Sequence, residues 1–157
     1  MDKLKTYGIV QGRGKHYEEA LYSLALLYNI CNTKMSAYLK KHNLTVGKFN
    51  ILVAIKTHGG EEGISQVEIS KHLIVTPSNM TKLIDKLEKD KLVTRSALEG
   101  DRRVNIIKVT ATAANMLDKM WDEYSKELEG LMGKLSKKDQ EIISSNLVKW
   151  LSAILEE

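Results

Sequence analysis

One stretch, residues 76–110, constrains the fold most because its hydrophobic pattern changes period part-way along. Thr76 is a favourable helix N-cap, and Pro77 suits the first helical position, where its missing N–H would have no partner. Apolar residues then recur every three or four positions, as on one face of a helix; they are Met80, Leu83, Ile84 and Leu87. The pattern predicts a helix with one buried face and one polar, basic face.

The same stretch continues as two strand-like runs, residues 92–97 and 104–109. Residues 98–103 join the runs, and Gly100 and Asp101 within them favour a turn. We therefore expect a β-hairpin that carries Arg102 and Arg103 at its tip.

A second, shorter helix is expected upstream. Ser65 and Glu68 have the spacing of a capping box, which opens a helix running to about Leu73, with Val67 and Ile69 available for packing. Two helices joined by a short turn form a helix-turn-helix, and the hairpin makes it a winged one. Because a helix fits the major groove of B-DNA and a slim hairpin tip reaches the narrower minor groove, this combination indicates DNA binding.

Short motifs extend this pattern along the chain. They are Leu44-Thr45, Ile64-Ser65, Glu68-Ile69, Leu73, Leu87-Glu88, Leu92-Val93, Arg95, and Asp101-x-Arg103 followed by Val109-Thr110. In order and spacing they resemble the MarR family of bacterial transcription regulators, from about residue 21 to the end of the chain. The resemblance implies a mainly α fold with a small β-wing, in which a winged helix-turn-helix domain is joined to N- and C-terminal dimerisation helices.

Four regions follow from this interpretation. They are a flexible N-terminal arm (1–15), an N-terminal dimerisation helix (16–43), a winged helix-turn-helix DNA-binding region (44–110) and C-terminal dimerisation helices (111–157). The terminal helices carry more large apolar residues than one core-facing stripe needs, so we expect them to pack on each other and on a second copy. We call the helix that begins at Pro77 the reading helix. A two-fold dimer would present two reading helices ~34 Å apart to a pseudo-palindromic site. A closed monomeric bundle is the alternative.

The charge distribution points to an anionic partner. The pI is about 9.0 and the net charge is +4. Residues 71–108 hold nine Lys or Arg against five Asp or Glu, whereas the rest of the chain holds fifteen of each. The whole excess therefore lies on the predicted reading region. A solvated mixed-charge face is the alternative interpretation.

The candidate DNA contacts lie on the reading helix and the wing. For the major groove we predict Ser78, Asn79, Thr81, Lys82 and Lys86, with Asn79 and Lys82 at base edges and the hydroxyls nearer phosphates. The resemblance implies that Arg103 reaches the minor groove and that Asp101 orients the wing loop, with Arg102 a second cation near phosphate. The alternative is a solvated turn with a local Asp–Arg pair.

Lys91 departs from the family pattern, because relatives usually have a glycine there that closes the reading helix in a left-handed turn. We therefore expect either a small backbone strain at Asp90 or Lys91, or a different helix end.

The resemblance also implies release from DNA by a small aromatic or lipophilic compound. Residues that could line its pocket are Tyr28, Met35, Tyr38, Phe49 and Trp121. Such a stripe of aromatic and methionine side chains is more often plain core.

Redox sensing by Cys31 is an alternative mechanism, because peroxide-sensing relatives use a cysteine in this first helix. Their reactive residue corresponds to about Leu24, so we expect Cys31 to be a small buried apolar residue. The histidines at 16, 42, 58 and 72 are scattered, and no metal or other cofactor is expected.

The main rival functions are an enzyme and a protein-binding winged helix. No nucleophile elbow, phosphate loop or metal-hydrolase motif is present, so catalytic residues are not expected. A protein-binding face would expose large apolar side chains where this chain has Ser, Asn, Thr and Lys. One cysteine and a polar N-terminal segment favour a cytoplasmic protein. If the chain regulates transcription, we expect it to act as a repressor.

Overall fold

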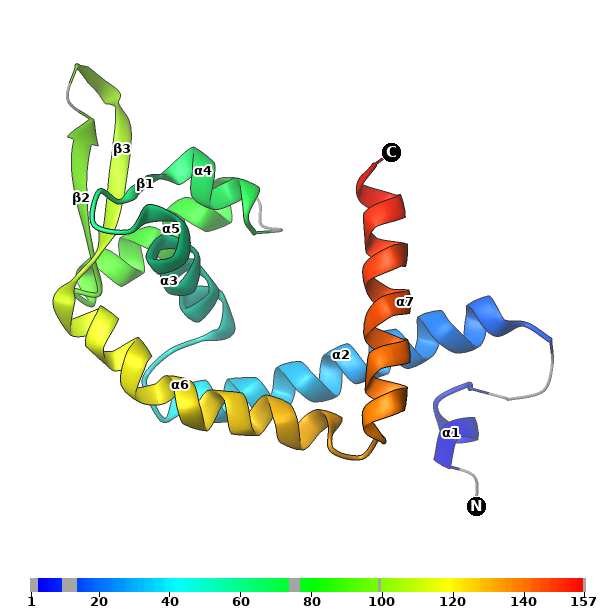
Figure 1. Cartoon of the computed structure of the whole chain (residues 1–157). Coiled ribbons are helices and arrows are strands. Elements are labelled where there is room, and N and C mark those ends of the chain that lie inside the picture. The colour runs from blue at the N-terminus through cyan, green and yellow to red at the C-terminus, as the bar shows by residue number, and fades with distance from the viewer. Residues whose placement is uncertain (1–2, 10–13, 74–76, 99, 157) are drawn as a thin grey trace. The chain divides into compact units, whose positions relative to one another are not determined.

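The computed structural model describes residues 3–9, 14–73, 77–98 and 100–156. Its elements in chain order (Figure 1) are α1 (Lys3–Thr6), α2 (His16–Lys40), α3 (Val46–Gly59), β1 (Ile64–Ser65), α4 (Gln66–Lys71), α5 (Pro77–Lys89), β2 (Val93–Leu98), β3 (Asp101–Val109), α6 (Ala111–Met132) and α7 (Lys137–Leu155). The chain divides into two compact units, residues 1–118 and 119–157. The expected mainly α fold with a small β-wing is confirmed.

Helix starts follow local capping chemistry. The side chains of Thr45, Ser65 and Ser136 each accept a hydrogen bond from the backbone N–H three residues further on, over 3.1–3.3 Å. Each hydroxyl thereby satisfies a first-turn donor that has no partner within the helix. Thr76, the predicted cap of the reading helix, lies outside the described residues.

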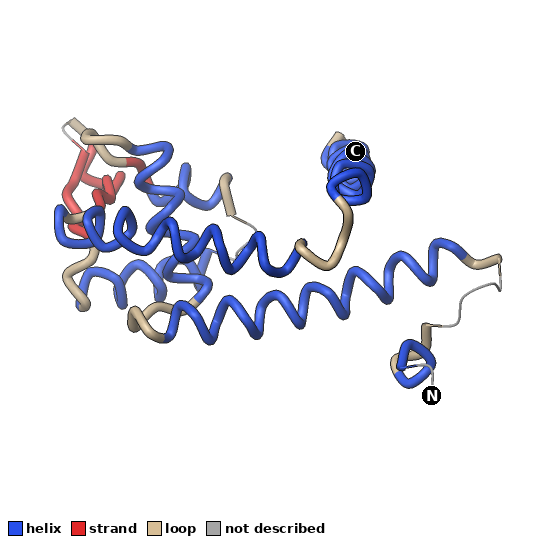
Figure 2. Tube along the Cα trace, turned by 60° about the horizontal axis from the view of Figure 1, so that its bottom comes forward, coloured by secondary structure: helices blue, strands red, loops and turns tan. Residues whose placement is uncertain are grey.

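The three strands form one small antiparallel sheet in the order β1-β3-β2, and the other elements of the first unit are helices (Figure 2). Ile64 of β1 pairs with Ile107 of β3, so β1 is an edge strand of this sheet. Gly63 precedes this strand with φ +81°, and a Cβ there would meet the carbonyl oxygen of Ile107 at 2.7 Å. Only glycine allows the loop to approach β3 so closely.

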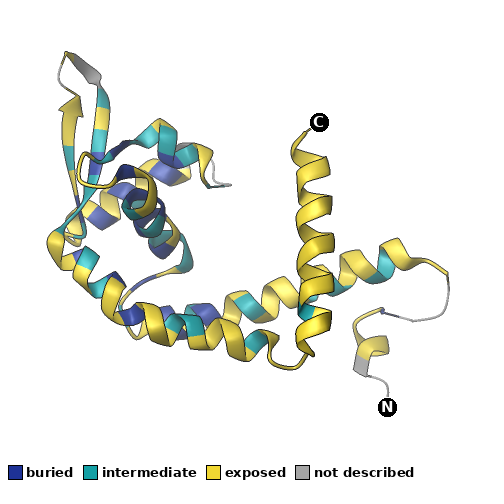
Figure 3. Cartoon of the chain, in the orientation of Figure 1, coloured by how far each residue is buried: buried dark blue, intermediate teal, exposed yellow. Residues whose placement is uncertain are grey.

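The core of the first unit lies where α3, α4, α5 and the sheet meet (Figure 3). Its fully buried side chains include Leu52, Ile55, Ile69, Met80, Ile84, Leu87 and Ile107. Val67 was expected to be available for packing, but 68% of it is exposed. The six residues of α4 present only a narrow face to the core, and Ile69 occupies it.

The wing differs from the expected hairpin at its tip. The second strand begins at Asp101, three residues earlier than predicted, so Arg102 and Arg103 belong to β3. The register changes from Ala97 opposite Asn105 to Leu98 opposite Asp101, which leaves residues 102–104 as a bulge. The local turn signal located the reversal but did not reveal this irregular pairing.

Within the region predicted as a flexible N-terminal arm, residues 1–15, the described residues include the short helix α1. The N–H of Ile9 bonds to the carbonyl of Leu4 at 3.1 Å, and Gly8 adopts φ +78°. Ile9 is buried. This is a left-handed helix end of the kind that glycine favours.

The second unit, residues 119–157, consists of the rest of α6 and the whole of α7. Every described residue of α7 except Gln140 is exposed, and none is buried (Figure 3). Exposed large apolar side chains nevertheless lie along it: Ile142, Ile143, Leu147, Val148, Trp150, Leu151, Ile154 and Leu155. An amphipathic helix with no buried face has an unmet packing requirement.

Among the described residues, no helix combines the length and the apolar character needed to cross a membrane.

Candidate nucleic-acid interface

The reading helix α5 has a fixed inner face. Met80, Ile84 and Leu87 are 0% exposed, and the helix contacts α3, α4 and β2. Burying three large apolar side chains stabilises this orientation by roughly 1.5–3 kcal/mol for each of them. The opposite face of α5 is therefore held toward solvent.

That outer face carries three lysines and one asparagine in a row, Asn79, Lys82, Lys86 and Lys89, which we call the cationic stripe. All four side chains are exposed, and their spacing of three or four residues places them along one side of the helix. Within the described part of the chain, none of the three lysines forms an ion pair. Neighbouring like charges at this spacing destabilise a helix by about 0.2–0.5 kcal/mol per pair, a penalty that an anionic ligand would relieve.

Arg95 of β2 forms ion pairs with two carboxylates of α5. Its Nη2 lies 2.6 Å from Oδ1 of Asp85, and its Nε lies 3.5 Å from Oε2 of Glu88. The Arg95 side chain is 23% exposed, so these pairs are less screened than fully solvated ones. Two consequences follow: the charge left on the outer face of α5 is positive, and the wing strand is tied to the reading helix.

The end of α5 shows the strain expected at Lys91, which adopts φ +60°. The N–H of Lys91 bonds to the carbonyl of Glu88 at 2.9 Å, and the N–H of Leu92 bonds to that of Leu87 at 2.9 Å. These two bonds are those of a Schellman motif, in which the left-handed position usually holds glycine. The helix thus ends in the left-handed turn expected there, with a lysine in the strained position.

Thr110 fixes the base of the wing against this helix end. Its N–H donates to the carbonyl of Leu92 at 3.0 Å, and its hydroxyl donates to the carbonyl of Lys91 at 3.0 Å. The same Oγ1 accepts from the N–H of Ala113 at 3.2 Å, which starts α6. Lys48 of α3 also forms an ion pair with Asp90. Reading helix and wing are therefore held together by several short contacts.

Gln66 of α4 is part of the reading surface but was missed in the sequence. Its Nε2 donates to Oγ1 of Thr81 on α5 over 2.7 Å, at the exposed surface. Thr81 is exposed, as predicted, and its hydroxyl accepts this hydrogen bond from α4. No local pattern signals a contact between side chains fifteen residues apart.

Four of the predicted site residues have side chains outside the described part of the structure: the DNA contacts Ser78, Arg102 and Arg103, and the wing-orienting Asp101. Their backbone positions are known. Ser78 is in the first turn of α5, and the other three open β3 beside the reversal of the hairpin. The first three residues of β3 therefore include two arginines.

Known proteins resemble this chain in amino-acid sequence. The HTH-type transcriptional regulator MhqR of Bacillus subtilis is 26% identical over 124 residues, which cover 79% of this chain and 83% of MhqR. A model of the MarR family matches residues 44–104, the part that includes α3 to α5 and most of the wing. Residues 44–104 therefore carry the sequence pattern of the MarR family.

Solved structures of other proteins share the MarR-family fold. The DNA complex of MepR from Staphylococcus aureus has a TM-score of 0.76 at 23% identity, covering 84% of this chain and 96% of that one. BpsR of Bordetella bronchiseptica, whose DNA binding is regulated by 6-hydroxynicotinic acid, has a TM-score of 0.76 at 20% identity, covering 84% and 98%. The chain therefore has the winged helix-turn-helix fold of MarR-family regulators, and its curated relative MhqR is a transcriptional regulator.

The residues predicted to line an effector pocket occupy different environments. Met35, Tyr38 and Phe49 are 8%, 2% and 3% exposed and belong to the core of the first unit. Tyr28 is 67% exposed on α2, and Trp121 lies in the second unit.

Cys31 and the histidines have simple surroundings. Cys31 is a free, half-buried thiol on α2. His58 and His72 stack with ring centroids 3.7 Å apart and planes 1° from parallel, an arrangement that their sequence spacing did not suggest. Among the described residues, no three His, Cys, Asp or Glu side chains gather as metal ligands.

Proposed function

We propose that the chain binds double-stranded DNA sequence-specifically, as a homodimer on a pseudo-palindromic operator, and represses transcription there. The observation that carries this proposal is the cationic stripe of α5, because its lysines are unpaired while the carboxylates beside them, Asp85 and Glu88, are paired with Arg95. Among the described residues of α5, no large hydrophobic side chain is exposed, which favours DNA over a protein partner. A dimer seated on an operator that overlaps a promoter excludes the polymerase.

In this proposal α5 enters the major groove. Asn79 and Lys82 contact base edges, Lys86 contacts phosphate, and the hydroxyls of Ser78 and Thr81 lie near the backbone. Arg103 reaches the minor groove from the wing, Arg102 pairs with phosphate, and Asp101 orients the wing loop.

The homodimer is supported by the exposed apolar faces of the terminal helices. In the first half of α2, Leu21, Leu24 and Leu27 are 40–56% exposed, and Tyr17, Tyr22 and Tyr28 are 52–67% exposed. In α7, Leu151 and Ile154 are more than half exposed. Contiguous apolar surface of this kind marks an association site. A second copy related by a two-fold axis would cover these exposed apolar faces.

Selection of bound sites from random duplexes by the purified protein tests the proposal. We expect the enriched sequences to contain two inverted half-sites, 10–10.5 base pairs apart from centre to centre. Sedimentation of the free protein should give the mass of a dimer. Enrichment of single, unpaired sites, or no enrichment over input DNA, would contradict the proposal.

We further propose that a small aromatic ligand releases the operator. The regulation of BpsR by 6-hydroxynicotinic acid supports this part of the proposal. Of the predicted lining residues, Tyr28 is the exposed one in the first unit and is the candidate ligand contact. Fluorescence anisotropy of operator complexes, titrated with hydroxylated aromatic acids, is the test. A fall in affinity that Tyr28→Ala weakens is expected, and unchanged affinity with every acid would count against it.

A further inference from the structure

Gln66 lies beside the reading surface although it belongs to the preceding helix. It is the first residue of α4, and its amide Nε2 donates to Thr81 Oγ1 at 2.7 Å. Thr81 is two residues from Asn79 and one from Lys82, near the start of α5. The Gln66 amide therefore lies next to the part of the reading helix that enters the groove in a helix-turn-helix.

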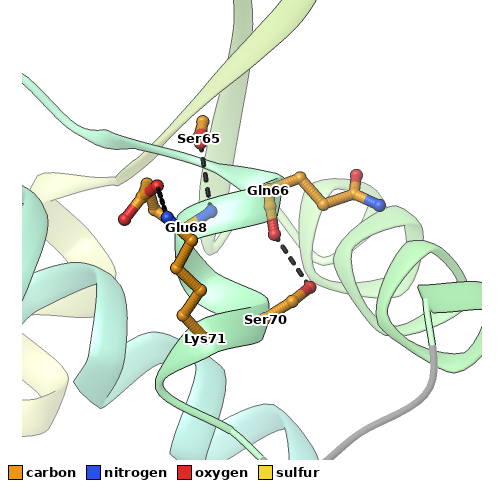
Figure 4. A network of polar contacts seen from close by, with 5 residues as sticks. All are labelled: Ser65, Gln66, Glu68, Ser70 and Lys71. Atoms are coloured by element: carbon orange, nitrogen blue, oxygen red, sulfur yellow. Dashed lines mark hydrogen bonds and ion pairs between the residues drawn. The ribbon is translucent and has the colours of Figure 1, made fainter.

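The backbone under Gln66 is well braced (Figure 4). Ser65 Oγ accepts from the N–H of Glu68 at 3.1 Å, and the Glu68 carboxylate pairs with Lys71 at 2.6 Å. The Ser70 hydroxyl donates to the carbonyl of Gln66 itself at 3.0 Å. These bonds hold the single turn of α4 from which the Gln66 side chain extends, so its amide is placed in advance of binding.

The bond to Thr81 uses only part of the amide. A glutamine amide has two N–H donors and one carbonyl acceptor. Within the described part of the chain, its only hydrogen-bond partner is the Thr81 hydroxyl. A second N–H and Oε1 therefore remain for a ligand at the surface.

We propose that Gln66 anchors the reading helix to a DNA phosphate, with one amide N–H on Thr81 and the other on a phosphate oxygen. This inference rests on the proposed DNA binding. Phosphate is favoured over a base edge because the first helix of a helix-turn-helix crosses the backbone while the second occupies the groove. Neutral amide donors commonly bind phosphate oxygens in this way, which sets register without reading sequence.

The position of Gln66 predicts a distinctive pattern of affinity. Gln66→Ala should weaken binding about tenfold on every operator variant, because it removes a hydrogen bond to a charged group. The slope of log K against log salt should stay unchanged, because no cation is removed. Gln66→Glu should weaken binding further, and more so at low salt, because a carboxylate then faces the phosphate.

Neutral methylphosphonates, placed one at a time along the operator, identify the anchored phosphate. One position in each half-site should lower the affinity of the wild type severalfold and leave that of Gln66→Ala unchanged. Thr81→Val should remove part of the same sensitivity, because the amide loses its brace. Phosphates held by lysines should affect wild type and variant equally.

Three results would overturn the inference while leaving the proposed function intact. They are an unchanged affinity of Gln66→Ala, equal sensitivity of wild type and variant to every methylphosphonate, and a loss confined to operators with one particular base. A loss explained by unfolding is detected by thermal denaturation of the free variant, and it would also overturn the inference. Failure of the wild type to bind any selected duplex would instead remove the proposed function itself.

Discussion

Lys91 shows how one residue can carry strain without changing the fold. Its φ of +60° disfavours any side chain with a Cβ, yet Leu87 and Leu92 close the helix end around it with normal hydrogen bonds. The buried Leu87 therefore keeps the helix end in place. The side chain of Lys91 is exposed, so nothing in the described structure requires a lysine there.

Replacing Lys91 with glycine should stabilise the protein by about 1 kcal/mol, because the left-handed strain is relieved. For a chain of this size that corresponds to a rise in Tm of about 2–4 °C in thermal denaturation. Lys89→Gly is the matched control: it removes a neighbouring lysine within the helix and should destabilise by about 1 kcal/mol. A Lys91→Gly protein that melts at or below the wild-type temperature would refute the strain.

At the scale of single elements, substitutions on the reading helix α5 test its contribution to DNA affinity. Lys82 and Lys86 are exposed, unpaired and four residues apart on α5. Replacing both with alanine should reduce the slope of log K against log salt by about 1.8, because the phosphate that Lys86 contacts in each of the two subunits, at about 0.9 apiece, is no longer neutralised. Binding should be measured between about 50 and 200 mM salt. The control is the double substitution of Lys126 and Lys149, exposed lysines of the second unit, which should leave the slope unchanged.

The clamp from the wing strand to the reading helix can be tested in the same way. Arg95→Met keeps the aliphatic stem but leaves Asp85 and Glu88 unneutralised beside the DNA. Because ion pairs at the surface contribute about 0–1 kcal/mol, unfolding should change little, whereas operator affinity should fall severalfold. Asp85→Asn in the same background should restore much of the affinity, since it removes one repelling charge. Absence of rescue would show that Arg95 acts only through the fold.

Elements set by local chemistry were predictable from the sequence, and those set by tertiary contacts were not. Thr45, Ser65 and Ser136 are caps whose partners lie three residues away, so their signals are local. The bulge in β3 and the exposure of Val67 depend on how strands and helices meet, which periodicity does not specify.

The candidate site divides in the same way. The exposed lysines of α5 follow from helical spacing once the apolar stripe is known. The Arg95 clamp and the Gln66–Thr81 bond join residues ten to fifteen positions apart on different elements, so only the fold reveals them.

On the scale of the whole molecule, the exposed apolar surface of α7 should be the interface of a dimer. Leu147 and Leu151, four residues apart on one face, are 41% and 54% exposed. Changing both to glutamate should convert the dimer to a monomer in sedimentation, because two charges would be buried at the interface. Lys149→Glu alters the net charge by the same amount on the same helix and should remain dimeric. A double variant that stays dimeric would place the interface elsewhere.

The most direct test of the central claim is the affinity for the selected operator before and after five base pairs are inserted between its half-sites. Half a helical turn moves the second half-site to the opposite side of the duplex, where a two-fold dimer cannot place its second reading helix. We predict that affinity falls at least about 100-fold and recovers in part when ten base pairs are inserted instead. Equal affinity for the original and five-base-pair duplexes would contradict paired reading by two copies of this chain.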